Sequence, residues 1–349
     1  MSYVESNELF LAYQSTYRRY HSTETAVVIV HNDLLRAVDS GRRGRLSAPV
    51  LLDLSLAFDT VHHTVLLGIL ENRFLVSGVL LDWFRSYLTD RWQTFYTGGS
   101  QSAAFALDCS VLQGSVLGPV EFIAYTEDFT ELFRRYQLHY HLYADDKQLY
   151  DDVLVSQAGT LLWRFVDCVS KVRDWCTSRR LQLNATKTEF AWFGSHANML
   201  KLSRDDCSLS VGDVSIKPSP VVRDLGVLLD AELTAKQDVN NVAKICFFQR
   251  RRIRRPRRCV DHNTAMQLVC SLVLSRLNYC NIVLSGLPKW TISILQHGQH
   301  NDTSNRASVP SSAIAVTHQM DFVSGKLSLP ISMISLILQN SNVPLNRTF

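Results

Sequence analysis

The chain reads HYHLYADDKQLYDD over residues 139–152, and this stretch decides the fold. Apolar and aromatic residues flank Ala144-Asp145-Asp146 on both sides, which is typical of two short strands joined by a tight turn. Earlier in the chain, Val50-Leu51-Leu52-Asp53-Leu54 is a second apolar run with a single acid. It predicts a buried strand that ends at a functional position. Two such strands could bring three carboxylates together.

A carboxylate in an apolar strand is costly to bury unless a metal ion, a cation or several hydrogen bonds compensate its charge. Three acids at neighbouring strand ends would suit Mg²⁺, and two such ions support phosphoryl transfer. Each motif alone also has an ordinary structural explanation. Asp53 could simply end a strand, and both Asp145-Asp146 and Gln113-Gly114 could be turns, where such residues are common.

The rest of the pattern predicts a mixed α and β protein. Helical spacing of apolar residues is expected over 62–74, 79–88, 120–136, 158–180 and, in a smaller basic lobe, 234–284. Strands are expected over 91–97, 103–109 and 189–193, the first two joined by a turn at Gly98-Gly99-Ser100. Residues 195–220 are predicted to form a loop with one weak strand. From 297 on, Ser, Asn and Thr dominate, and disorder or poor packing is expected.

Composition points to a globular protein with a local basic segment. The 349 residues are 46% hydrophobic and 19% charged, enough for a sizeable core in two or three lobes. Net charge is only +4, but residues 244–259 hold eight Lys and Arg and no acid. This segment favours a nucleic-acid contact, although a solvated helix face or a nuclear-import signal has the same composition.

The sequence gives no reason to expect a signal for export or for membrane insertion. The eight cysteines form no CxxC pair, and the first sixty residues show no secretory leader, so the thiols are predicted to be reduced. The apolar stretch 327–338 contains Pro330 and has roughly half of the ~20 residues that a membrane span needs. We therefore expect an intracellular protein of the cytoplasm, the nucleus or both, with no membrane role.

In order, these segments resemble the reverse-transcriptase motifs of non-LTR (LINE-type, jockey-like) retrotransposons. Residues 14–26 resemble the fingers segment that leads into the palm. The four central motifs, A to D, are matched by LDLSLAFDTV (52–61), LQGSVLGP (112–119), YADD (143–146) and LNATKTE (183–189). The primer-grip region is matched by DLGV (224–227), and the thumb by SRLNYCN (275–281) and GLP (286–288). The resemblance covers about residues 12–296.

The resemblance implies an α+β fold, a right-hand polymerase palm of antiparallel strands backed by helices in the split βαβ manner. Partial fingers would occupy residues 1–48. The palm, with embedded fingers helices and a hairpin and with motifs A to E, would occupy 49–230. A helical basic thumb would follow over 231–296, and a divergent, disordered tail over 297–349.

The resemblance also implies an RNA-directed DNA polymerase that acts by two-metal nucleotidyl transfer. Asp53 and Asp145 would hold both Mg²⁺ ions, or Mn²⁺ in their place, with Asp146 beside them and the Leu54 carbonyl completing one coordination shell. Lys187 would lie near the leaving pyrophosphate and could donate a proton to it. Without the family, Lys187 is an exposed lysine on a turn.

Substrate contacts follow from the same resemblance. Phe58 would lie under the sugar of the incoming deoxynucleoside triphosphate, where its ring would collide with a 2′-hydroxyl; without the family, Phe58 could be core. Gln113 and Gly114 would contact the incoming nucleotide and the template base, with glycine permitting close backbone approach. Arg18 and Arg19 could clamp the triphosphate.

The RNA template and DNA primer would be held by two further regions. Leu225 and Gly226 belong to the segment that resembles the primer grip. A thumb helix would follow the duplex backbone through phosphate contacts without reading its sequence, using Lys244, Arg250, Arg251, Arg252, Arg254 and Arg255.

Several positions depart from the family pattern. Leu112 stands where proline is usual, 125–128 are more polar than usual, and Pro256 would interrupt the basic helix at a cost of ~3 kcal/mol. The earlier fingers segments and an endonuclease domain are expected to be missing from this chain, and the family pattern stops after Gln296. A truncated or frameshifted element copy is expected, whose endonuclease could be a separate domain on another chain.

Three hypotheses remain open from the sequence. The first is an active RNA-directed DNA polymerase. The second is a catalytically inactive remnant that still binds RNA or RNA/DNA duplex through its arginines. The third is a reading frame with no cellular role.

Overall fold

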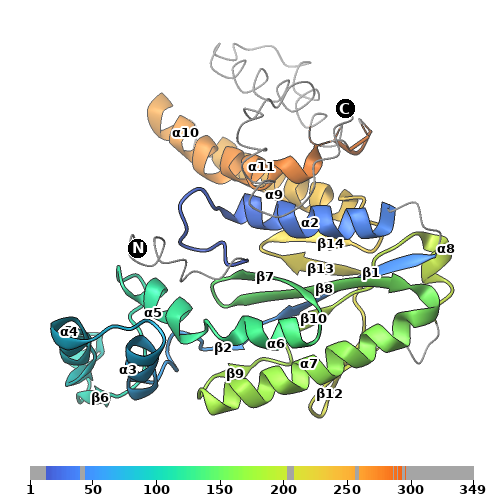
Figure 1. Ribbon diagram of the computed structural model, residues 1–349. Helices are drawn as coiled ribbons and strands as arrows, with labels where there is room; N and C mark the ends of the chain where they lie inside the picture. The colour runs from blue at the N-terminus through green and yellow to red at the C-terminus, as the bar shows by residue number, and fades with distance from the viewer. Residues whose placement is uncertain are drawn as a thin grey trace. The chain divides into compact units, whose positions relative to one another are not determined.

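The computed structural model describes residues 13–39, 44–202, 208–255, 259–285, 287–288, 290–292 and 295 (Figure 1). The chain divides into two compact units. The described residues up to Gly226, with Ala231–Leu233, form the first unit, and Val227–Asp230 with the described residues from Thr234 on form the second. The predictions for Pro256 and for the tail over 297–349 fall outside the described residues.

A four-stranded antiparallel sheet is the centre of the first unit. Its order is β10-β1-β8-β7, with bounds β10 (Glu189–Phe190), β1 (Arg45–Leu52), β8 (Asp146–Leu154) and β7 (His139–Tyr143). Helices cover both faces, α2 (Thr23–Asp39) on one and α6 (Phe129–Arg135) with α7 (Ala158–Ser178) on the other (Figure 1). Because both faces are covered, β1 is buried almost without interruption, which explains its continuous apolar run. The predicted α+β fold of antiparallel strands backed by helices is confirmed.

The two long helices follow their sequence patterns. In α2, Ser22 and Thr25 form a reciprocal cap: Ser22 Oγ accepts from Thr25 N at 3.2 Å, and Thr25 Oγ1 accepts from Ser22 N at 2.8 Å. In α7, buried residues recur every three or four positions, the spacing of one helix face. They are Ala158, Leu161, Leu162, Phe165, Cys168, Val169, Val172 and Cys176. The helix predicted over 158–180 is therefore confirmed, with its end two residues earlier.

The helix predicted over 120–136 is wrong in one respect, because it is two helices. α5 (Gly118–Tyr125) ends before Thr126, and α6 begins at Phe129. Thr126 has φ −108° and ψ 13°, and its hydroxyl donates to the Phe122 carbonyl at 3.1 Å. Such a side-chain bond to the preceding turn competes with helix continuation. Before this break, α3 (His63–Asn72) and α4 (Gly78–Leu88) agree with their predictions to within a few residues.

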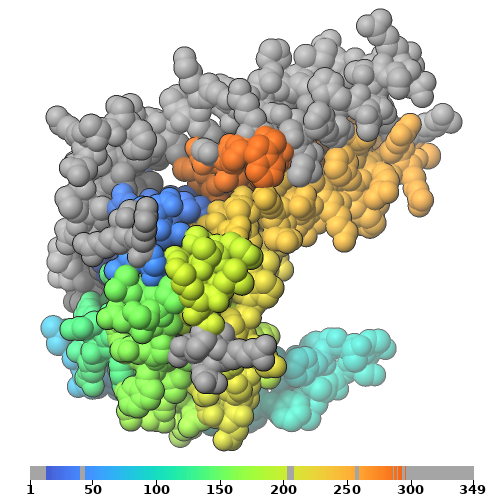
Figure 2. All heavy atoms as spheres, turned by 90° about the vertical axis from the view of Figure 1, so that its right-hand side faces the viewer, coloured from blue at the N-terminus to red at the C-terminus, as the bar shows by residue number. Residues whose placement is uncertain are grey.

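The hairpin predicted around Gly98-Gly99-Ser100 is confirmed. β3 (Arg91–Gln93) pairs with β6 (Phe105–Leu107), and β4 (Tyr96–Thr97) pairs with β5 (Ser100–Gln101). Gly98 and Gly99 both have positive φ, 54° and 82°, as a tight hairpin turn requires. Figure 2 shows the teal segment that contains this hairpin extending away from the green helices of the first unit.

Short elements complete the first unit. They are β2 (Leu54–Ser55), η1 (Val155–Gln157), β9 (Gln182–Leu183), α8 (His196–Met199), β11 (Leu209–Val211), β12 (Val214–Ile216) and β13 (Val221–Asp224). The prediction of one weak strand within 195–220 was wrong, since β11 and β12 pair as a hairpin and α8 precedes them. β11 is buried at Leu209 and Val211 against the α7 side of the core. The polar composition of 195–220 gave no indication of these buried positions.

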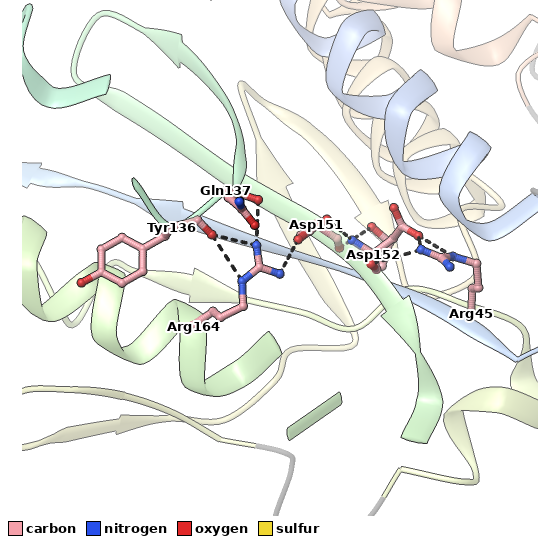
Figure 3. Close-up of polar contacts among 7 residues, drawn as sticks. Arg45, Tyr136, Gln137, Asp151, Asp152 and Arg164 are labelled. Atoms are coloured by element: carbon pink, nitrogen blue, oxygen red, sulfur yellow. Dashed lines mark hydrogen bonds and ion pairs between the residues drawn. The ribbon is translucent and has the colours of Figure 1, made fainter. Parts of the chain in front are cut away.

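Two arginines form ion pairs with acids in the second half of β8 (Figure 3). Arg164 of α7 donates to Asp151 of β8 at 2.8 Å and to the carbonyls of Tyr136 and Gln137 at 2.8 and 2.7 Å. Arg45 of β1 pairs with Asp152. Arg164 thus ties α7 both to the sheet and to the loop that leads into β7.

Apart from one strand, the described part of the second unit is helical, as the pattern over 234–284 predicted. Its elements are β14 (Val227–Asp230), α9 (Lys236–Arg254), α10 (His262–Val269), the π-helical turn η4 (Cys270–Leu274), α11 (Ser275–Asn278) and η5 (Asn281–Leu284). A small cluster of Ala235, Val239 and Leu284 forms a core, with Leu287 packed against it. Across the described ranges of both units, no helix has the length and apolar character of a membrane span.

Candidate active site

Two strand ends carry the three acids. Asp53 directly follows β1, and Asp145 lies in the turn between β7 and β8, where Asp146 begins β8. The antiparallel register pairs Leu52 with Lys147. Continued by one residue beyond the paired strand, this register brings Asp53 to the level of Asp146.

The acids feel one another electrostatically. Desolvation by the surrounding fold and the negative charges of Asp145 and Asp53 raise the pKa of Asp146, Lys147 lowers it, and the net result is a pKa of about 6. The Asp146 residue is exposed overall, although its carboxylate is partly desolvated. The three carboxylates therefore share one electrostatic environment.

A lysine from a separate loop reaches the same place. Asn184 N donates to the Asp53 carbonyl at 2.9 Å, and Asn184 Oδ1 accepts from the backbone nitrogens of Thr186 and Lys187 at 3.2 Å. This turn directs Lys187 so that its Nζ lies 3.4 Å from Asp53 Oδ2. The lysine side chain is 67% exposed. The structure thus places Lys187 beside Asp53, and the charge of Asp53 acts, with that of Asp145, on Asp146.

Leu54 and Phe58 lie just beyond the strand. Leu54 is buried and pairs with Leu183 of β9. The Phe58 ring stacks on Phe122 of α5, with centroids 4.5 Å apart and planes 19° apart. Phe58 is only partly buried, so one side of the ring belongs to the core and the remainder is accessible. Both explanations of this residue, core and substrate floor, are compatible with its position.

Gln113 and Gly114 occupy an exposed turn before α5. Ser115 N donates to the Leu112 carbonyl at 3.1 Å, and Ser115 Oγ accepts from Gly118 N at 2.9 Å. Gly114 has φ +82°, a conformation that strongly favours glycine. A Cβ at this position would meet nothing within 4 Å, so the conformation of the chain, and not crowding, requires glycine there.

The two predicted triphosphate arginines differ in their surroundings. Arg18 is half-buried and donates to the Gln14 carbonyl at 3.3 Å. Arg19 is exposed, with its guanidinium 4.8 Å from the ring centroid of Tyr20. Tyr17, the residue before them, has its pKa raised by burial and by the charge of Asp145. Tyr17 was not predicted from sequence as a neighbour of the acids.

A buried polar chain links the segment before α2 through β7 and β8 to β13. Ser15 Oγ lies 2.9 Å from His141 Nε2, His141 Nδ1 lies 3.1 Å from Gln148 Oε1, and Gln148 Nε2 donates to Asp224. Burial raises the pKa of Asp224 to about 7. After Asp224, Leu225 and Gly226 both have positive φ, 43° and 91°, so the predicted primer-grip residues form a tight turn.

Sequence reasoning gave no role to Gln14, Lys147 or Asp224. The sequence gives little signal for Lys147, since its strand β8 reads DKQLYDDVL and carries other polar residues as well. Gln14 had none, because its partner Ala144 lies 130 residues away in the chain.

The predicted basic residues all lie in the second unit. Lys244, Arg251 and Arg255 are exposed and recur at intervals of seven and four, which places them on one face of α9 and its end. Arg250, Arg252 and Arg254 are exposed as well. The buried residues of α9 are Val239, Ala243 and Cys246.

The carboxylates fit a divalent cation in two respects. Asp53 Oδ2 is buried and accepts no hydrogen bond, although the Lys187 ammonium lies 3.4 Å away. Mutual repulsion among the acids is what a bound cation relieves. Within the described residues, no three His, Cys, Asp or Glu side chains stand together as a ready metal-ligand group. Mg²⁺ in phosphoryl-transfer sites is usually bound by one or two carboxylates with substrate phosphates and water.

Two curated proteins are similar to this chain. The probable RNA-directed DNA polymerase from transposon BS of Drosophila melanogaster is 26% identical over 255 residues, covering 69% of this chain and 26% of that protein. The RNA-directed DNA polymerase from mobile element jockey of Drosophila funebris is 23% identical over 236 residues, covering 66% and 24%. The chain thus spans about a quarter of the length of these relatives.

Solved structures with similarity include telomerases. Apo telomerase from Candida tropicalis, truncated from the C-terminal domain, has a TM-score of 0.45 at 12% identity over 66% of this chain and 42% of that one. Telomerase from Candida albicans in complex with a fragment of telomeric RNA has a TM-score of 0.44 at 12% identity, over 98% and 54%. The family model described as reverse transcriptase (RNA-dependent DNA polymerase) matches residues 3–227. As its motifs predicted, this chain belongs to the reverse transcriptase family.

Proposed function

We propose that this chain acts as the RNA-directed DNA polymerase of a non-LTR retrotransposon. It would join deoxynucleotides to a DNA primer on an RNA template. Family membership supports the reaction class, and the names of its relatives support the mobile-element setting. The observation that carries the proposal is the meeting of Asp53, Asp145 and Asp146, close enough for the first two to raise the pKa of the third.

Asp53 and Asp145 would hold two Mg²⁺ ions, with Asp146 beside them and the Leu54 carbonyl as a further ligand. Bound ions of this kind activate the attacking oxygen and neutralise charge on the transferred phosphoryl group. Mn²⁺, which accepts the same oxygen ligands, could replace them. The chain's own contribution is to hold the carboxylates at a fixed separation through the β1–β8 register.

Other side chains would bind the triphosphate and its sugar. Lys187 can move from Asp53 toward a leaving pyrophosphate, because its side chain is largely exposed. The Phe58 ring, which stacks on Phe122, would lie against the sugar of the nucleotide. Gln113 and Gly114 would contact the nucleotide and the template base, and Arg18 and Arg19 would bind phosphate oxygens.

We further propose fingers, palm and thumb over 1–48, 49–230 and 231–296. The exposed basic residues of α9 and the adjoining Arg255 would follow the phosphates of the template-primer duplex. Leu225 and Gly226 would lie near the primer end. A separate endonuclease domain would then act on the target DNA.

Primer extension tests the proposal. The full chain is incubated with a DNA primer annealed to RNA, Mg²⁺ and deoxynucleoside triphosphates. Extension is expected from the wild type and should be abolished in Asp145→Ala. Asp174→Ala, an exposed acid on α7, is the matched control and should extend normally. A folded wild type that does not extend, or extension that persists in Asp145→Ala, would refute the polymerase.

A second candidate function is duplex binding without catalysis, favoured by the exposed arginines of α9 and by departures from the family pattern such as Leu112. Filter binding over a salt series distinguishes it. A phosphate-dominated contact weakens steeply with salt, and Arg251→Ala should reduce the slope by about one. Tight binding with a flat salt dependence would contradict this candidate.

A further inference from the structure

The turn that carries the acids has an unusual backbone. Tyr143 pairs with Asp146, so Ala144 and Asp145 are the two central residues of a β-hairpin turn. Ala144 has φ +54°, whereas Asp145 is outside the positive-φ region. Positive φ at the first central position normally calls for glycine. Alanine is disfavoured there by roughly 1–2 kcal/mol, so neighbouring groups must hold the turn in place.

Two side chains hold both polar groups of Ala144. Its N–H donates to Gln14 Oε1 at 3.3 Å, and its carbonyl accepts from Lys147 Nζ at 2.8 Å. Both bonds are buried. The peptide groups on either side of the strained residue are therefore fixed by one partner 130 residues away in the chain and by another only three residues away.

Gln14 is itself well fixed. Ser15 N donates to the Leu142 carbonyl at 3.1 Å, and Leu142 N donates to the Tyr13 carbonyl at 2.9 Å, so this segment runs beside β7. Gln14 Oε1 also accepts from Thr16 N at 3.1 Å. With only 1% of the residue exposed, Gln14 has little freedom to leave Ala144.

Lys147 is fixed from the opposite side of the turn. It is 1% exposed, and Nζ lies 5.5 Å from the ring centroids of both Phe122 and Phe129. A buried ammonium is costly unless such contacts compensate it. The rings and the Ala144 carbonyl together define where Nζ can lie. Phe122 is also the ring on which Phe58 stacks.

We propose that Gln14 and Lys147 are positioning residues that hold Ala144 in its left-handed conformation and thereby set the place of Asp145 and Asp146. This inference rests on the proposed polymerase function. Neither residue touches the reacting atoms. Their contribution should appear in turnover, because a misplacement of about 1 Å at a catalytic group can cost on the order of a hundredfold in rate.

Steady-state extension by Gln14→Ala and Lys147→Met tests the proposal. Each substitution removes one bond to Ala144, and methionine retains most of the lysine's volume. We expect kcat to fall at least tenfold, while KM for the deoxynucleotide and Kd for the template-primer stay within about twofold. Ser15→Ala is the matched control, since it removes a neighbouring buried hydrogen bond, to His141, and leaves Ala144 untouched. A kcat within twofold of wild type in Gln14→Ala, or an equal loss in Ser15→Ala, would overturn the proposal.

Rescue distinguishes positioning from general destabilisation. Glycine adopts positive φ without strain, so the double variant Gln14→Ala, Ala144→Gly should recover part of the turnover lost in Gln14→Ala. A purely structural role for Gln14 predicts no recovery, and that outcome would count against the proposal. If Lys147→Met does not fold, the Gln14 variants carry the test.

Amide exchange at Ala144, measured by NMR, needs no activity. The wild-type amide should be protected, and Gln14→Ala should raise its exchange rate at least tenfold while Ser15→Ala does not. Unchanged exchange in Gln14→Ala would overturn the positioning role. A wild type that fails to extend primers but shows the expected exchange would refute the polymerase and leave the clamp on Ala144 standing.

Discussion

Asp224→Asn should make the free energy of unfolding less sensitive to pH. Asp224 is 2% exposed, and its Oδ2 has no hydrogen-bond partner. Burial raises its pKa from 3.8 to about 7, the charge of Asp146 adds to the rise, and the bond from Gln148 lowers it. Asparagine keeps the oxygen that accepts from Gln148 and cannot ionise.

The sign follows from proton binding. Between about pH 4 and pH 7 the unfolded chain has lost this proton while the folded chain still holds it, so rising pH favours unfolding. The pKa difference of about 3 units corresponds to at most about 4 kcal/mol. Between pH 5 and pH 8 the wild type should lose about 2 to 3 kcal/mol of its free energy of unfolding through this group. The asparagine variant does not suffer it.

Urea unfolding followed by circular dichroism measures the effect, in EDTA so that no cation alters the charges. Relative to wild type, Asp224→Asn should gain about 2 to 3 kcal/mol more at pH 8 than at pH 5. Asp174→Asn, an exposed acid on α7, should follow the wild type at both pH values. An equal change at the two pH values, or a loss confined to pH 8, would refute the reasoning.

Three further predictions concern other contacts. Arg164→Ala should lower the free energy of unfolding by about 2 to 3 kcal/mol, because three oxygens lose their donor, two of them in half-buried bonds and one in an exposed bond. Lys171→Ala, which breaks an exposed pair, should cost less than about 1 kcal/mol, and similar costs would contradict this. Phe58→Ala should raise ribonucleotide incorporation relative to deoxynucleotide in single-nucleotide extension, and an unchanged ratio would remove the ring from the sugar site. Gly114→Ala should lower kcat/KM several-fold, since φ +82° is strained for alanine; unaltered kinetics would show that the turn is not used.

Local patterns predicted the strands that carry the acids. The apolar run before Asp53 and the aromatic runs around Asp145 are continuous because helices cover both faces of the sheet, so burial is visible in the sequence. The Gly98-Gly99 hairpin was equally visible, since it requires two residues with positive φ.

Long-range partners were beyond local patterns. Thr126 ends the first of two helices where one was expected, because its hydroxyl donates to the Phe122 carbonyl. A threonine within a helical pattern does not by itself predict such a break. Gln14 belongs to the segment that resembles the fingers motif, but its bond to Ala144 forms only because this segment runs beside β7, 130 residues later in the chain. Lys147 would ordinarily be placed on a surface, and only the rings of α5 and α6 make its burial possible.

The pairing of Leu52 with Lys147 has a consequence for how this chain tolerates insertions and deletions. Because side chains alternate faces along a strand, one residue gained or lost within β1 or β8 would turn an acid to the opposite side of the sheet. The same change in the exposed β4–β5 hairpin would leave the separation of Asp53 and Asp146 unaltered. Related sequences should therefore carry insertions and deletions in the segment of the chain that connects β1 to β8. They should not carry them within either strand.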